Sequence, residues 1–206
     1  MKLPVLKIGD LTAEVPIIQG GMAIRLSTAR LAAAVAQEGG IGLIAASGMA
    51  FDELRKEIRL ARKLTGGKGI IGINAMVAAR EFLGLITTAA EEKIDLIVAG
   101  AGFSRDIFAV GREHNVAVVP IVSSVKLAKI SEKLGAAAIV VEGTEAGGHL
   151  GTQQSIKDIL PDIVKAVNIP VIAAGGATDG AAVAELLKLG ASGVPVSYTH
   201  LRAHET

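Results

Sequence analysis

Short apolar runs alternate with longer segments of helical period along the whole chain, and this alternation restricts the fold more than any other feature. The runs are bounded by glycine or proline and are apolar at successive positions, which is typical of strands buried on both faces of a parallel sheet covered by helices. The strands predicted in this way are 17–19, 41–46, 70–75, 96–99, 117–122, 138–142 and 171–174, with an eighth starting near Gly193.

The segments between these strands are predicted to be helices. Their ranges are 27–38, 51–64, 81–93, 105–114, 125–134, 155–167 and 180–189. A hydroxyl residue that can cap the first turn precedes most of them, namely Ser27, Ser104, Ser124, Ser155 and Thr178. Seven βα units and the start of an eighth predict an α/β protein of the (β/α)8 TIM-barrel type in preference to an open doubly wound sheet.

Composition excludes several classes of function. Half of the 206 residues are hydrophobic and 20% are charged, which is ample for one large core. Lys and Arg number 21 against 20 Asp and Glu, so neither nucleic acid nor an anionic membrane is an expected partner. The chain has no cysteine, no signal-peptide pattern after Met1 and no apolar stretch near the ~20 residues that span a bilayer, so we expect a cytoplasmic protein.

Glycines and small polar residues follow nearly every predicted strand. In a TIM barrel the active site is built from these loops, at the end of the barrel where the strands finish. Each glycine pair alone would be ordinary turn chemistry, but together they predict one shared site. The positions are Gly20-Gly21-Met22, Ser47-Gly48, Asn74-Ala75-Met76, Gly100-Ala101-Gly102, Ser123-Ser124, Gly147-Gly148-His149 and Gly175-Gly176.

These loops supply many backbone N–H groups and few ionisable side chains, which favours an anionic or flat cofactor over a metal ion. Gly175-Gly176 follows the seventh strand, where TIM barrels commonly bind phosphate. His149 is the side chain here that can accept a proton near neutral pH, although a surface histidine in a tight turn is the simpler alternative. Glu142, at a strand end, is a candidate to hydrogen-bond a ligand or orient His149, whereas Glu145 is expected to be solvated.

The sequence changes character at Pro195. Residues 195–206 contain the only tyrosine and two of the four histidines, and they resemble a translated sequencing-adapter read-through. We therefore predict a barrel domain over 1–194, truncated at its eighth strand, followed by a foreign, disordered tail over 195–206. His200 and His204 have the spacing of a metal pair, but no third ligand accompanies them and no metal site is predicted.

The ordered motifs resemble those of the nitronate monooxygenase family, formerly called 2-nitropropane dioxygenases, over nearly all of residues 1–194. The same superfamily includes the flavin-dependent enoyl-acyl-carrier-protein reductases, which share the glycine-histidine loop. The opening 3–9 looks more similar to the bacterial nitronate monooxygenases. The motifs are Pro16-Ile17-Ile18-Gln19-Gly20-Gly21-Met22, Gly39-Gly40-Ile41-Gly42, Gly72-Ile73-Asn74, Gly100-Ala101-Gly102, Glu145-Ala146-Gly147-Gly148-His149-Leu150-Gly151 and Ile172-Ala173-Ala174-Gly175-Gly176.

The resemblance implies FMN in the barrel mouth, with His149 as the catalytic base. It implies oxidation of a nitronate by O2 to a carbonyl compound and nitrite. Reduction of an enoyl thioester with NAD(P)H, a phosphate-binding barrel without redox activity and an inactive fragment are the alternatives, and a homodimer is an option that the sequence leaves open. The expected FMN contacts, including Glu142 at its strand end, are Gly21, Met22, Asn74, Glu142, Gly147, Gly148, Gly175 and Gly176.

The family pattern continues after the eighth strand with a Gly-Thr phosphate turn and a further helical region. This chain has Pro195 and the adapter-like residues instead. We therefore expect the apolar wall of the first and last strands to be partly uncovered, and FMN to be held less firmly than by a chain with that region.

Overall fold

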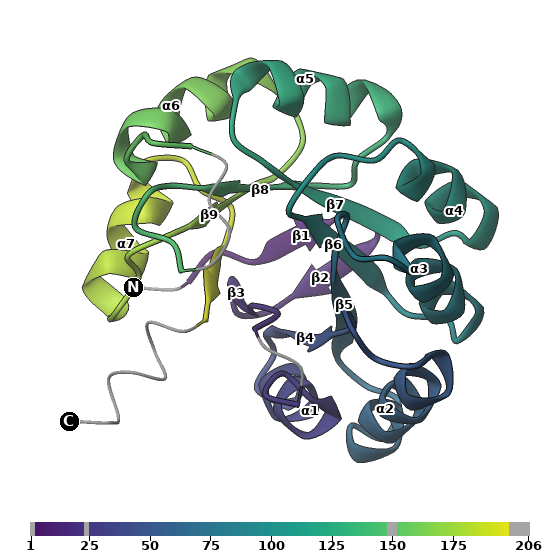
Figure 1. The fold of residues 1–206 in the computed structure, drawn as a ribbon. Helices are drawn as coiled ribbons and strands as arrows, with labels where there is room; N and C mark the ends of the chain where they lie inside the picture. The colour runs from purple at the N-terminus through teal and green to yellow at the C-terminus, as the bar shows by residue number, and fades with distance from the viewer. Residues whose placement is uncertain (1–2, 23–24, 148–151, 198–206) are drawn as a thin grey trace.

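A computed structural model describes residues 3–22, 25–147 and 152–197. In this part of the chain eight parallel strands form one sheet in the order β10-β3-β4-β5-β6-β7-β8-β9, with helices around it (Figure 1). The strands are β3 (Ile17–Gln19), β4 (Ile41–Ala45), β5 (Ile70–Met76), β6 (Leu96–Gly100), β7 (Ala117–Val122), β8 (Ile139–Glu142), β9 (Val171–Ala174) and β10 (Val194–Val196).

The two ends of this strand order meet, so the sheet closes into a barrel. Ile172 of β9 bridges Gly193, directly before β10, and the N–H of Ala173 donates to the carbonyl oxygen of Gly193 at 3.0 Å. On its other side β10 pairs with β3, with Val194 opposite Ile17. The predicted (β/α)8 barrel is confirmed.

Strand β10 extends two residues past the predicted domain boundary at 194. Pro195 lies opposite Ile18 and Val196 opposite Gln19, and the N–H of Gly20 donates to the carbonyl oxygen of Val196 at 2.9 Å. A parallel ladder is built from backbone groups, so it accepts side chains of many kinds. The first two residues assigned to the foreign tail therefore complete the barrel, while 198–206 lie outside the described residues.

The helices lie within two residues of the predicted ends. They are α1 (Ala29–Gln37), α2 (Phe51–Leu64), α3 (Phe82–Glu91), α4 (Asp106–His114), α5 (Val125–Leu134), α6 (Ile156–Ala166) and α7 (Gly180–Lys188).

Two of the five predicted N-caps are confirmed. Ser124 accepts a hydrogen bond from Leu127 N, and Ser155 accepts one from Lys157 N. The other three predictions were wrong, because each helix starts two residues after the hydroxyl residue, so that the residue between them is the N-cap. The N-caps there are Thr28 for Ser27, Arg105 for Ser104 and Asp179 for Thr178.

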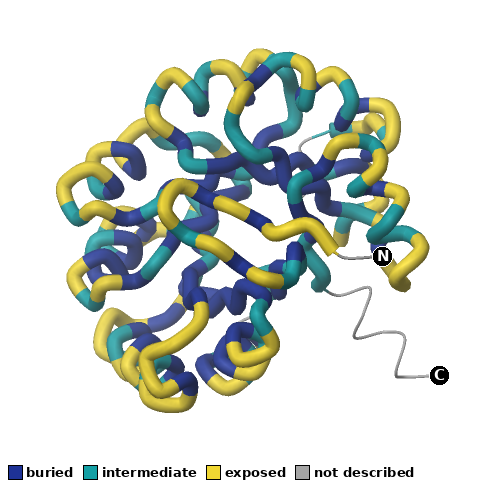
Figure 2. The backbone as a smooth tube through the Cα atoms, turned by 180° about the vertical axis from the view of Figure 1, so that it is seen from behind, coloured by how far each residue is buried: buried dark blue, intermediate teal, exposed yellow. Residues whose placement is uncertain are grey.

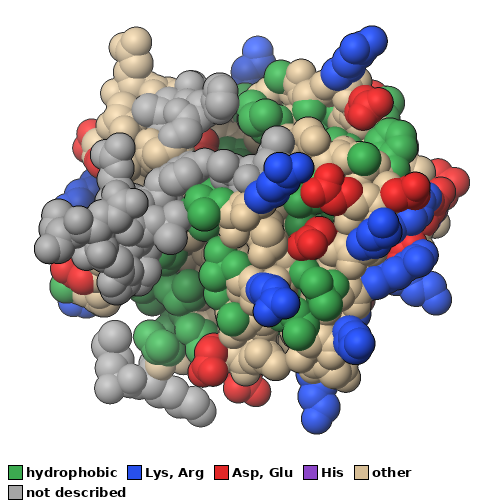
Figure 3. Space-filling model, turned by 60° about the horizontal axis from the view of Figure 1, so that its bottom comes forward, with side chains coloured by type: hydrophobic (Ala, Val, Ile, Leu, Met, Phe, Trp, Pro, Cys, Tyr) green, Lys and Arg blue, Asp and Glu red, His purple; other side chains and the backbone are tan. Residues whose placement is uncertain are grey.

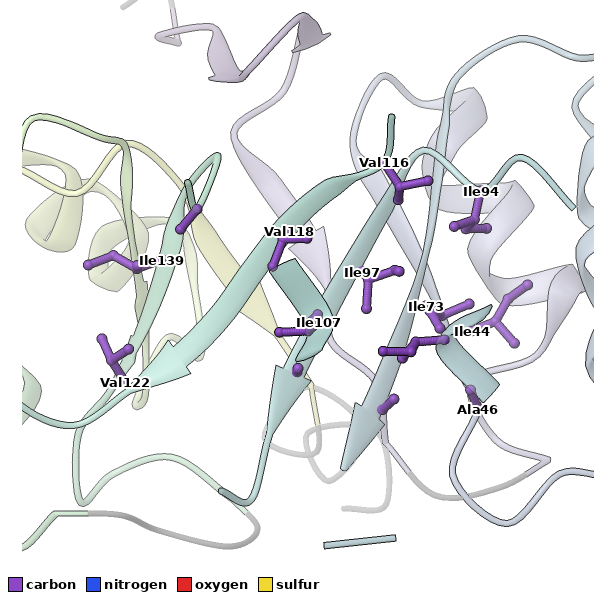
Figure 4. Packing of buried hydrophobic residues seen from close by; sticks show 14 of the residues in the cluster. Ile44, Ala46, Ile73, Ile94, Ile97, Ile107, Val116, Val118, Val122 and Ile139 are labelled. Atoms are coloured by element: carbon purple, nitrogen blue, oxygen red, sulfur yellow. The ribbon is translucent and has the colours of Figure 1, made fainter. Parts of the chain in front are cut away.

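Apolar side chains fill both faces of the barrel strands. Outside the barrel, Ile73 and Ile97 pack with the helices, as Figure 4 shows for part of this cluster. Inside it, Leu43, Val98 and Val140 form a second buried cluster. Because successive residues of a strand point to opposite faces, both clusters together explain why the runs are apolar without alternation.

A hairpin not predicted from the sequence closes the end of the barrel where the strands begin. Strands β1 (Leu6–Ile8) and β2 (Leu11–Ala13) pair antiparallel. Leu6 and Ile8 are buried in the inner cluster, and Leu6 packs against Gly193 at the start of β10. The view from behind shows the hairpin crossing this end (Figure 2).

The outer surface mixes charges of both signs, as one face shows (Figure 3).

Between α1 and α7 an apolar groove lies outside β3 and β10. Its lining includes Ile17, Leu31, Val35, Val183 and Val196. This groove runs along the outer face of the first and last strands of the barrel. Among the described residues, no helix is both long enough and apolar enough to cross a membrane.

Candidate functional site

A pocket opens at the end of the barrel where the parallel strands finish. Six of the residues expected to contact a cofactor line it: Gly21, Asn74, Glu142, Gly147, Gly175 and Gly176. Its floor is apolar and comes from the inside of the barrel. The floor residues are Ile18, Leu43, Val98, Ile121, Val140 and Ala174. Loops far apart in the sequence thus form one site because parallel strands bring their C-terminal ends together.

Gly21 lies directly against the side chain of Asn74. A Cβ atom built on Gly21 would be 2.2 Å from Asn74 Cβ and 2.8 Å from Asn74 Oδ1, so any larger residue would displace the amide. The carbonyl oxygen of Asn74 accepts a hydrogen bond from Ala46 N–H at 2.9 Å, which holds the backbone of this residue in the sheet. The pocket therefore presents a fixed backbone with an amide at its edge.

Glu142 ends β8 and is partly buried, and burial raises the pKa of its carboxyl group. Its protonated form, which can donate a hydrogen bond, persists to higher pH than in an exposed glutamate.

Glu145, three residues later, is exposed, as expected from the sequence. Its carboxylate accepts a hydrogen bond from Ile156 N–H at 3.0 Å, at the start of α6. Burial works against ionisation here, but this and further hydrogen bonds outweigh it and lower the pKa of Glu145. The two glutamates of this loop thus favour opposite protonation states.

The turn after β9 has a conformation that favours glycine. Gly175 and Gly176 have φ angles of +130° and +68°. A Cβ atom on Gly175 would be 3.1 Å from the backbone nitrogen of Ala146, so the loops after β8 and β9 touch. Helix α7 begins shortly after this turn, at Gly180. A glycine turn followed by a helix N-terminus is a suitable place for an anionic group.

Of the described residues expected to contact a cofactor, Met22 is not brought into this pocket. Met22 lines the neighbouring outer groove, and its N–H donates to Ser27 Oγ at 2.9 Å. Gly148 and the predicted base His149 lie outside the described residues.

Several pocket residues were not predicted from the sequence. Ala146, Ala177, Pro195 and Ser197 also line it. Ala146 and Ala177 each lie beside a glycine pair that was singled out, so the rule that strand ends carry the site would have found them. Within the described ranges, no three His, Asp or Glu residues group in a way that could hold a metal ion.

The nitronate monooxygenase family model matches residues 6–92 and 68–206. The chain belongs to the nitronate monooxygenase family. A probable nitronate monooxygenase of Staphylococcus aureus (strain MSSA476) is 30% identical over 241 residues, covering 95% of this chain and 67% of that protein. A relative from Rhodococcus jostii, named (3aS,4S,5R,7aS)-5-hydroxy-7a-methyl-1-oxo-octahydro-1H-indene-4-carboxyl-CoA dehydrogenase, is 32% identical and covers 93% of this chain.

Solved structures of the same superfamily have the same fold. FabK from Thermotoga maritima superposes with a TM-score of 0.86 at 37% identity over 93% of this chain. A nitroalkane oxidase from Streptomyces ansochromogenes superposes with a TM-score of 0.81 at 25% identity over 90% of this chain. The chain spans 60% of the FabK chain, 65% of the nitroalkane oxidase and 53% of the Rhodococcus protein.

The nitronate monooxygenase family comprises flavin-type oxidoreductases, and the pocket residues fit such a cofactor. The apolar floor suits one edge of a flat ring system, and the Asn74 amide and the Glu142 carboxyl offer polar partners beside it. The Gly175-Gly176 turn and the start of α7 suit a phosphate group. The cavity volume of about 90 Å³ is small for a flavin, so the loops around the pocket would also have to contact such a ligand.

Proposed function

We propose that this chain is the FMN-binding barrel of a nitronate monooxygenase, which oxidises alkyl nitronates with O2 to a carbonyl compound and nitrite. The observation that carries the proposal is the pocket at the strand ends that is lined by Gly21, Asn74, Glu142, Gly147 and the Gly175-Gly176 turn. The family match and the Staphylococcus aureus relative support the choice of reaction.

The bound flavin would supply the electron transfer, and the chain supplies position and polarity. Gly21 would leave room for the ring, and the Asn74 amide beside it would offer hydrogen bonds to the ring. Backbone N–H groups of Gly175, Gly176 and the start of α7 would hold the phosphate. Glu142 offers a carboxyl group to the pocket, and burial raises the pKa of that group. The apolar floor excludes water from below the reacting groups.

His149 is proposed as the base that removes the α-proton from a neutral nitroalkane. A nitronate has already lost this proton and needs no base. His149→Ala should therefore reduce turnover of nitroethane by roughly 10²–10⁴-fold and turnover of ethyl nitronate much less, with FMN binding kept. His114→Ala, at the end of α4, is the matched control and should change neither the turnover of the two substrates nor FMN binding. Equal losses on the two substrates would show that His149 positions the ligand and does not remove its proton.

Reduction of an enoyl thioester by NAD(P)H is the second candidate. The Rhodococcus relative, named for a carboxyl-CoA substrate and 32% identical, favours the thioester class. Anaerobic mixing separates the two reactions. Bleaching of the flavin absorbance by ethyl nitronate and not by NADH or NADPH supports the monooxygenase, and the reverse supports the reductase. A protein that binds no flavin at all would overturn both.

A further inference from the structure

Two buried polar side chains lie behind the loop that connects β3 to α1. Gln19, the last residue of β3, is 6% exposed, and Ser27 is 0% exposed. They are among the few polar residues buried in the described part of an otherwise apolar barrel. Burying such groups is unfavourable unless each finds a hydrogen-bond partner, so their contacts indicate what they hold in place.

The contacts allow only one orientation of the Gln19 amide. Leu43 N–H donates to Gln19 Oε1 at 3.2 Å, and only the oxygen can accept this bond. Nε2 therefore faces Ser27 Oγ at 3.0 Å and also donates to the carbonyl oxygen of Gly20.

The hydroxyl of Ser27 completes the cluster. It accepts a hydrogen bond from Met22 N–H at 2.9 Å, in addition to the one from Gln19, and lies 3.3 Å from the carbonyl oxygen of Gly20, to which it donates. Every donor in the cluster thus faces an acceptor. A helix-capping role for Ser27 does not account for these contacts, because Thr28 is the N-cap of α1.

The cluster acts on the backbone that forms one wall of the pocket. Gly20 and Gly21 line the pocket, whereas Gln19 and Ser27 do not. Gly21 in turn lies against Asn74. A shift of Gly20 or Met22 would therefore move the wall toward or away from the Asn74 amide.

We propose that Gln19 and Ser27 are positioning residues that hold the Gly20–Met22 backbone in the geometry that binds the flavin. The inference rests on the proposed FMN site. It assigns Gln19 and Ser27 a role through the loop, without direct contact with the cofactor.

Substitutions that remove the cluster should weaken FMN binding by protein that remains folded. Ser27→Ala leaves Met22 N–H and one Gln19 donor without a partner, and Gln19→Leu removes the amide. We expect the FMN dissociation constant to rise about tenfold or more in each, because the loop is then no longer fixed. Flavin fluorescence titration at 25 °C measures this.

Matched controls separate this effect from general destabilisation. Ser131 is also fully buried, on α5, and its hydroxyl has no hydrogen-bond partner among the described residues. Gln37, at the end of α1, donates to the carbonyl oxygen of Leu64 at 3.0 Å, at the opposite end of the barrel. Ser131→Ala and Gln37→Leu should leave the FMN dissociation constant within about twofold of the original value.

Gln19→Glu gives a readout that a purely structural role would not produce. A protonated carboxyl keeps an acceptor and one of the two donors of the amide, whereas a carboxylate would face the carbonyl oxygen of Gly20 with an acceptor. Burial raises the pKa of such a carboxyl. FMN affinity of Gln19→Glu should therefore approach the original at about pH 5 and fall at about pH 8, relative to the unsubstituted protein at each pH. Gln19→Leu should bind weakly at both.

Amide hydrogen exchange in the flavin-free protein distinguishes failure of this inference from failure of the proposed function. Faster exchange at Gly20 and Met22 in Ser27→Ala and Gln19→Leu, with α5 unchanged, supports the positioning role even if the original protein binds no FMN, which would overturn the proposed function. Unchanged exchange together with an unchanged FMN dissociation constant in both variants would overturn the inference.

Discussion

The two ends of the barrel use the same βα repeat for different purposes. Where the strands begin, the β1–β2 hairpin covers the opening, and Leu6 and Ile8 are at most 1% exposed. Where the strands end, glycines such as Gly21 and Gly176 leave the backbone accessible around a pocket. Bulky residues that seal one end contribute to stability, and small residues that open the other end give room to a ligand.

The carboxyl groups at the two ends of the barrel also have different surroundings. Asp95, directly before β6, forms a two-pronged ion pair with Arg62 of α2 at 2.8 Å for each contact, and it accepts the Ile71 N–H at 2.8 Å. At the other end Glu142 makes no ion pair with a described residue, and burial raises its pKa. A paired charge stabilises the closed end, whereas the open end has a carboxyl group with no ion-pair partner among the described residues.

The largest expected effect is a loss of stability when the packing of the β1–β2 hairpin against the barrel is disrupted. Ile8→Ala removes a fully buried side chain from the inner cluster and should lower the free energy of unfolding by about 2–5 kcal/mol. Urea denaturation measures the loss. Leu3, at 45% exposure, is the control, and Leu3→Ala should change stability by about 0.5 kcal/mol or less. The FMN affinity of the folded protein should not change in either variant, and a fall in Ile8→Ala would show that the two ends are not separable.

The next effect is confined to the open end. Gly21→Ala places a methyl group where the Asn74 side chain lies, so FMN affinity should fall by about tenfold or more, or about 1.4 kcal/mol. Gly66, which follows α2 at the opposite end of the barrel, has open space around its Cα, and Gly66→Ala should leave the FMN affinity of the folded protein unchanged. If Gly21→Ala binds FMN as well as the control does, the wall between Gly21 and Asn74 is not part of the cofactor site.

Much of the fold and part of the site could be predicted from the sequence. Strands such as Ile41–Ala45 and helices such as Phe51–Leu64 are long enough to show their period, and their order alone implies a barrel. Asn74 and Gly176 were predicted to share a site because both end or follow parallel strands. The β1–β2 hairpin was missed because three residues are too few to show a period.

The contacts inside the loops could not be predicted from the sequence. Ser27 was expected to cap α1 by a rule based on neighbouring residues, whereas its hydroxyl is used by Gln19, eight residues earlier, and by Met22. Glu145 was expected to be solvated, but it also holds the start of α6 through Ile156 N–H. Such contacts depend on how the loop folds back on the strand, which leaves no periodic pattern in the sequence.

The smallest expected effect tests the charge at the open end. Since burial raises the folded-state pKa of Glu142 above its ordinary value, its contribution to stability is fully present below that ordinary value and is lost as pH rises through the raised pKa. The variant Glu142→Gln carries no charge at this position. Its free energy of unfolding, relative to that of the original protein, should therefore increase as pH rises through the raised pKa of Glu142 and stay constant at higher pH. Glu145→Gln should behave in the opposite sense, because the pKa of Glu145 is lowered and its contribution is lost as pH falls through that lowered value. Urea denaturation of both variants from about pH 3 to pH 8 measures the two trends, that of Glu145 at the acidic end of the range. The same trend in both would mean that the burial of Glu142 does not distinguish it from its exposed neighbour.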